Sequence, residues 1–72
     1  MDQKSIKINK DEDFITLGVL LKITGVISTG GQAKFFLMDN DVLVNGELEN
    51  RRGRKLYRGD KIQIKNSLFL IE

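Results

Sequence analysis

The residues best suited to bind a ligand are the cations of one short stretch in the second half of the chain, residues 51–58. Arginine binds phosphate through two parallel hydrogen bonds and stacks on planar groups, and tyrosine can stack on a base. A dense mixture of such groups, free of acids, favours nucleic acid, above all looped or single-stranded RNA, over a solvated basic loop that balances nearby acids. The stretch is Arg51-Arg52-Gly53-Arg54-Lys55-Leu56-Tyr57-Arg58, and five of its eight residues are cations.

A second stretch, Ser28-Thr29-Gly30-Gly31-Gln32-Ala33-Lys34, could hold phosphate. Two glycines at a helix start leave backbone N–H groups uncovered beside the positive end of the helix dipole, and Lys34 adds a charge one turn later. The spacing differs from the G-x-x-x-x-G-K-[ST] pattern of nucleotide-binding loops. An ordinary capped helix, whose glycines only permit a tight turn, explains the same residues, so both interpretations stay open.

Catalysis and metal binding find little support. The chain has no histidine and no cysteine, which removes the commonest general base and any thiolate metal site. Asp11, Glu12 and Asp13 are adjacent and do not converge on one point, and they lack the spacing of a calcium loop. We therefore expect no catalytic residue, metal or cofactor, and no small-molecule substrate.

The size of the chain and the distribution of its charges narrow the remaining classes of function. A chain of 72 residues buries roughly 60% of its unfolded surface, too little for a deep enzyme pocket. The net charge is only +2, yet residues 51–65 hold seven cations and one acid, whereas residues 36–50 hold four acids and no cation. The Met1-Asp2 start lacks a signal-peptide pattern, and no apolar run approaches the ~20 residues of a membrane span. We expect a monomeric, soluble cytoplasmic protein with one positive face.

The hydrophobic pattern predicts an α+β domain over residues 1–72, without repeat or linker. Thr29 and Gln32 fit a capping box, in which the Thr29 hydroxyl bonds the Gln32 N–H and the Gln32 side chain reaches back. Asn45-Gly46 is a strong hairpin signal, and Asn45 could also present its amide to a ligand. Gly25 is a reasonable end for the first helix. We expect, in chain order, a strand over 5–9, helices over 14–24 and 30–38, and strands over 42–44, 47–49, 61–65 and 68–71.

Four segments, in this order and spacing, carry a family resemblance: Leu17–Thr24, Ser28–Lys34, Val42–Gly46 and Arg58–Ile62. They resemble the S4 RNA-binding domain over about residues 14–65. Thr29–Lys34 and Arg51–Leu56 are similar to the small stand-alone bacterial S4 proteins of the YaaA and YbcJ kind. The resemblance implies two packed helices followed by a small antiparallel sheet, here with an added N-terminal strand.

The resemblance also implies a function: a non-catalytic protein that recognises structured RNA, chiefly ribosomal or transfer RNA. Our leading prediction is that this chain binds ribosomal RNA in ribosome assembly. Many S4 domains carry an arginine and an aspartate where this chain has Ile15-Thr16-Leu17-Gly18. We therefore expect residues 51–58 to make most of the RNA contacts. From the residues and the resemblance together, the predicted RNA-binding residues are Ser28, Thr29, Gly30, Gly31, Gln32, Lys34, Asn45, Arg51, Arg52, Arg54, Lys55, Tyr57 and Arg58.

A protein–protein adaptor is the alternative from another class. The basic loop could dock on an acidic protein, with an exposed phenylalanine as anchor. Phe35 and Phe36 cannot both face the core from one helix, and Phe36 fits the buried register better. Phosphate contacts alone do not distinguish RNA from DNA.

Overall fold

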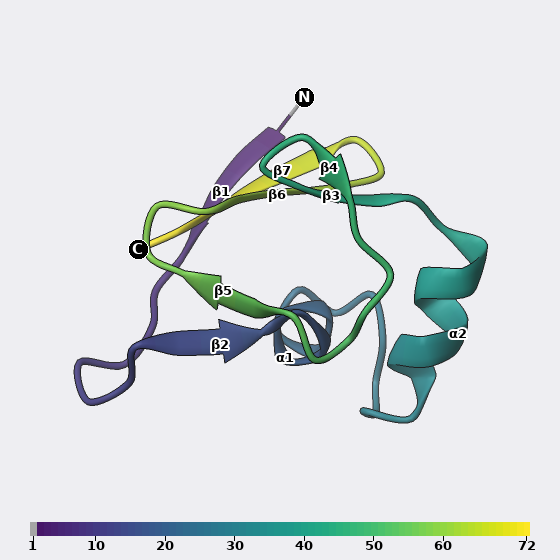
Figure 1. The fold of residues 1–72 in the computed structure, drawn as a ribbon, viewed down its shortest axis with the longest axis horizontal. Coiled ribbons are helices and arrows are strands. Elements are labelled where there is room, and N and C mark those ends of the chain that lie inside the picture. The colour runs from purple at the N-terminus through teal and green to yellow at the C-terminus, as the bar shows by residue number, and fades with distance from the viewer. Residues whose placement is uncertain (1) are drawn as a thin grey trace.

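The fold is a five-stranded sheet covered on one side by two short helices and a two-stranded ribbon, as the computed structural model of residues 2–72 shows (Figure 1). The larger sheet has the order β1-β7-β6-β3-β4, and the ribbon pairs β2 with β5. β1 runs parallel to β7, and the other pairs are antiparallel. The α+β, S4-like architecture is confirmed. The elements are β1 (Asp2–Ile6), β2 (Phe14–Thr16), α1 (Leu17–Ile23), α2 (Gln32–Asp39), β3 (Val42–Val44), β4 (Glu47–Leu48), β5 (Lys55–Tyr57), β6 (Lys61–Ile64) and β7 (Ser67–Ile71).

One apolar core fills the space between these layers. Strand residues two apart point to the same face, so each strand of the sheet contributes alternate residues. The helices contribute residues three and four apart, which lie on one helix face. The largest fully buried side chains are Leu17, Leu20 and Leu21 of α1, Leu56 of β5, Val42 and Val44 of β3, Ile62 of β6 and Ile71 of β7.

The first helix begins three residues later than predicted. Residues 14–16 stay extended and pair with β5, Phe14 opposite Tyr57 and Thr16 opposite Lys55. Thr16 then caps α1, because its Oγ1 accepts a hydrogen bond from the Val19 N–H at 3.3 Å. The predicted end is confirmed: Gly25 has a φ of +83°.

The second helix also begins late, at Gln32, and only half of the capping box forms. Gln32 Oε1 accepts hydrogen bonds from the backbone N–H groups of Ser28 at 2.6 Å and Thr29 at 3.3 Å. The predicted bond from the Gln32 N–H to the Thr29 hydroxyl was wrong, because the Thr29 carbonyl accepts that N–H at 3.1 Å. Phe36 packs against the core and Phe35 is 64% exposed, as the helical register predicted.

The C-terminal half follows the predicted strands more closely. The Asn45-Gly46 hairpin is confirmed, with φ of +53° and +85°, as a two-residue turn requires. The strand β5 was not predicted, because its residues lie in the segment interpreted as a basic loop. The first strand occupies residues 2–6 rather than 5–9, since it pairs in register with β7 from Asp2–Ser67 to Ile6–Ile71. Neither helix within residues 2–72 is long and apolar enough to cross a membrane.

Candidate nucleic-acid interface

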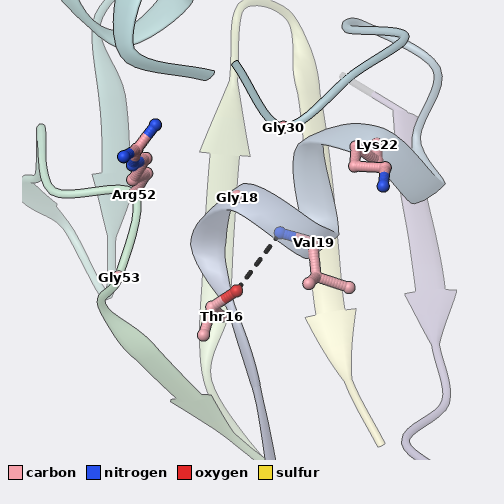
Figure 2. A pocket seen from close by; sticks show the side chains of 7 residues that line it. All are labelled: Thr16, Gly18, Val19, Lys22, Gly30, Arg52 and Gly53. Atoms are coloured by element: carbon pink, nitrogen blue, oxygen red, sulfur yellow. Dashed lines mark hydrogen bonds between the residues drawn. The ribbon is translucent and has the colours of Figure 1, made fainter. Parts of the chain in front are cut away.

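A surface hollow lies where the start of α1 meets the basic loop that leads into β5 (Figure 2). Its volume is about 380 Å³. Two cations, Lys22 of α1 and Arg52 of the loop, lie on either side of the first turn of α1. Two of the lining glycines, Gly30 and Gly53, have open space where a side chain would lie, so a ligand can approach their backbone. The lining residues are Thr16, Gly18, Val19, Lys22, Gly30, Arg52 and Gly53.

Backbone hydrogen bonds fix the loop against the helix start. The Leu17 N–H donates to the Arg54 carbonyl at 2.9 Å, and the Gly18 N–H donates to the Arg52 carbonyl at 2.8 Å. These bonds continue the β2–β5 pairing into the first turn of α1. A Cβ at position 18 would lie 3.3 Å from the Arg52 carbonyl oxygen, so glycine permits this close approach.

Glu49 organises two of the arginines. Its side chain is buried, and its Oε1 and Oε2 accept hydrogen bonds from Arg51 Nη2 at 3.2 Å and Arg51 Nε at 3.0 Å. Arg54 Nη1 donates to Glu49 Oε1 at 2.8 Å. The Arg51 bonds, aided by Arg54, lower the pKa of Glu49 to about 2 against the opposing effect of burial. The same contact raises the pKa of Arg51.

This pairing divides the predicted cations into two groups. Both ion pairs found within residues 2–72 are made by Glu49, with Arg51 and Arg54. Arg52 and Lys55 have no carboxylate partner there, so their charges are available to a phosphate. The sequence prediction treated all five cations as equal and did not single out Glu49. An acid two residues before Arg51 was the available signal.

The side chains of Arg58 and Asn45 lie outside the lining of the hollow and make hydrogen bonds within the fold. Arg58 Nη2 donates to the carbonyls of Ile8 at 3.4 Å and Asn9 at 3.0 Å, which ties the N-terminal segment to the turn after β5. Asn45 Nδ2 donates to Asp60 Oδ1 at 3.0 Å, and Asn45 Oδ1 accepts the Lys61 N–H at 2.9 Å. Their contact with RNA stays a prediction.

The predicted stretch before α2 is only partly brought to the hollow. Gly30 lines it beside Arg52. The backbone N–H groups of Ser28 and Thr29 already bond Gln32, whereas no hydrogen bond found within residues 2–72 uses those of Gly30 and Gly31. Lys34 lines a separate hollow, formed by α2 and the chain around β4.

The sequence prediction missed four lining residues on β2 and α1: Thr16, Gly18, Val19 and Lys22. Thr16 and Gly18 were missed because the predicted helix over residues 14–24 placed no strand beside the basic loop. Val19 is 44% exposed and adds an apolar side chain to the lining of the hollow.

Residues 6–72 match the family model of the S4 domain. The chain belongs to the S4 domain family. Among curated proteins it is similar to the "Probable ribosome maturation protein RlbA" of Bacillus subtilis (strain 168), with 56% identity over 57 residues. The match covers 79% of this chain and 80% of that relative. No group of three or more metal-ligating side chains occurs in the part of this S4 chain that the structure describes.

Proposed function

We propose that this S4 protein is a non-catalytic RNA-binding protein that recognises ribosomal RNA during ribosome assembly, with residues 1–72 acting as one domain. Membership of the S4 family and the similarity to a ribosome maturation protein support this function. The observation that carries it is the hollow itself, where Lys22 and Arg52 flank exposed glycine backbone without a carboxylate partner in residues 2–72. The proposed place of action is the cytoplasm, and the proposed state is a monomer.

Phosphate neutralisation is the proposed mechanism. Arg52 and Lys22 contact phosphates that enter the hollow, and the backbone at Gly30 and Gly53 lets the RNA chain approach closely. Arg51, held by Glu49 but with a side chain 72% exposed, adds positive potential at the rim. These contacts position the RNA without reading its sequence, which suits recognition by shape.

The adaptor alternative gains nothing from the family match or the relative. In that alternative the basic loop docks on an acidic protein, and the same cations serve a different partner. RNase treatment of complexes captured with the protein separates the two functions, because RNA-bridged partners are lost and directly bound proteins remain.

The test of the site compares Arg52→Ala and Lys22→Ala with Lys4→Ala, a control that removes one exposed charge from the edge strand β1. Fluorescence anisotropy with a ribosomal RNA fragment measures affinity across a salt series. Each site variant should lower the slope of log affinity against log salt by about 1, since one phosphate contact is lost. An effect of Lys4→Ala as large as that of Arg52→Ala would show that only net charge matters.

A further inference from the structure

The outer face of the β2–β5 ribbon carries an aromatic pair that the sequence did not predict, because residue 14 was expected in a helix. Phe14 lies opposite Tyr57, and Thr16 lies opposite Lys55. Residues directly opposite on paired strands project to the same face, so all four side chains share one face of the ribbon. Leu56, between Tyr57 and Lys55, points the other way and is fully buried. The ribbon therefore has one core face and one face open to a ligand.

Tyr57 is the open ring of this pair. Tyr57 is 48% exposed. The centroid of its ring lies 6.0 Å from that of Phe14, at an interplanar angle of 53°. Lys55 Nζ lies 4.9 Å from the centroid of the Phe14 ring and so covers part of Phe14. Neither cation–π contact found within residues 2–72 involves Tyr57. Phe14 lies against the tyrosine on one side, and about half of the residue stays exposed.

The open ring is continuous with the phosphate hollow. Thr16 lines the hollow and also sits on the ribbon face, two residue pairs along from Phe14 and Tyr57. Strand residues two apart are separated by about 7 Å, so Lys55 and Tyr57 can contact neighbouring parts of one nucleotide. Beyond Phe14 the chain turns into the acids Asp11, Glu12 and Asp13, which repel phosphate. These acids disfavour phosphate beyond the Phe14 end of the ribbon.

We propose that this ribbon face is a binding site for one unpaired nucleotide, whose base stacks on Tyr57 while the Lys55 ammonium contacts its phosphate. The proposal rests on the proposed RNA-binding function and specifies its substrate: a helical RNA with an unpaired nucleotide beside the paired region. A paired base is covered by its neighbours in the helix and cannot lie on a protein ring. An unpaired base of any identity can, because every base has a stacking face.

The chain provides its own reporter for this contact. Tyr57 is the only tyrosine, and there is no tryptophan, so intrinsic fluorescence excited for tyrosine reports this ring alone. The probes are two ribosomal RNA hairpins that share the same loop and the same paired stem and differ only in a single bulged adenine in the stem of one of them. The bulged hairpin should quench the Tyr57 emission and bind about tenfold more tightly, since stacking on an aromatic ring has this order of effect.

Variants separate stacking from phosphate contact. Tyr57→Leu should abolish the preference for the bulged hairpin, Tyr57→Phe should restore it, and Arg52→Ala should weaken both hairpins alike. Circular dichroism checks that each variant is folded. Equal affinity for the two hairpins, with unchanged tyrosine emission in complexes that anisotropy shows to be formed, overturns the stacking site but leaves the RNA-binding function intact. Binding to neither hairpin overturns both.

Discussion

At the scale of single residues, Glu49 decides how the basic loop is held. Its buried carboxylate receives three hydrogen bonds from the side chains of Arg51 and Arg54 and one from the Arg51 backbone N–H. Glu49→Gln should therefore lower the free energy of unfolding by about 1–3 kcal/mol, the size of hydrogen bonds to a charged group. Urea denaturation measures this loss. Glu47→Gln is the matched control, since Glu47 is exposed and makes no ion pair within residues 2–72.

The same residue gives a pH dependence with a definite sign. The pKa of Glu49 is lowered from 4.5 to about 2 in the folded state, so the unfolded chain takes up its proton first. The stabilisation is fully present above pH 4.5 and is lost as the pH falls towards 2. The stability difference between the wild type and Glu49→Gln should shrink over that range. A difference that stays constant from pH 6 to pH 2.5 would contradict the carboxylate's role.

Only part of the division between paired and free cations could be read from the sequence. The Glu49 pairs with Arg51 and Arg54 join residues two and five positions apart, so the acid beside the basic stretch was a local signal. The bonds from Arg58 to the carbonyls of Ile8 and Asn9 join residues about 50 positions apart, and only the folded chain brings them together. The types of the binding residues were therefore predictable, whereas the structural use of Arg58 was not.

At the scale of the elements, the junction of β2 and α1 positions the hollow. The Thr16 hydroxyl caps the helix at the point where the strand ends. Thr16→Ala should lower the free energy of unfolding by about 1 kcal/mol, and Thr16→Ser should lower it much less because serine retains the capping oxygen. Thermal or urea unfolding checks the pair. Equal stability of the two variants would show that the hydroxyl contributes nothing.

Gly18 tests the close approach of the loop to the same helix. A side chain at this position meets the Arg52 carbonyl oxygen at 3.3 Å, and that oxygen also accepts the Gly18 N–H. Gly18→Val should displace the loop and lower the free energy of unfolding by about 1–3 kcal/mol. Gly53→Ala is the control, because a Cβ there meets nothing within 4 Å. Similar stability losses in both variants would contradict the packing argument.

The elements also show which parts of the fold can be predicted from the sequence. The Asn45-Gly46 hairpin was predictable because its signal is local, two residues that accept positive φ between apolar strands. The ribbon β2–β5 was not, because Phe14 and Tyr57 are far apart in the chain and neither strand has a hairpin turn to its partner. The apolar spacing of Phe14, Leu17, Leu20 and Leu21 fits a helix equally well, and tertiary pairing decides the outcome.

At the scale of the whole molecule, the charges are segregated. In Figure 1, α1, the β2–β5 ribbon and the loop that leads into β5 lie together on one side of the five-stranded sheet. Along the chain, residues 51–65 hold seven cations and one acid, whereas residues 36–50 hold four acids and no cation. Cations are therefore clustered along the chain around the basic loop, although the net charge is only +2. Association with RNA should therefore be oriented and strongly dependent on salt.

The central claim, that this S4 protein binds RNA through phosphate contacts at the hollow, is tested most directly by fluorescence anisotropy across a salt series. The ligands are a ribosomal RNA fragment and duplex DNA of equal length. We predict tighter binding to the RNA, with log affinity falling steeply against log salt and less steeply for Arg52→Ala. If the protein bound neither the RNA nor the DNA at low salt, the result would contradict the account.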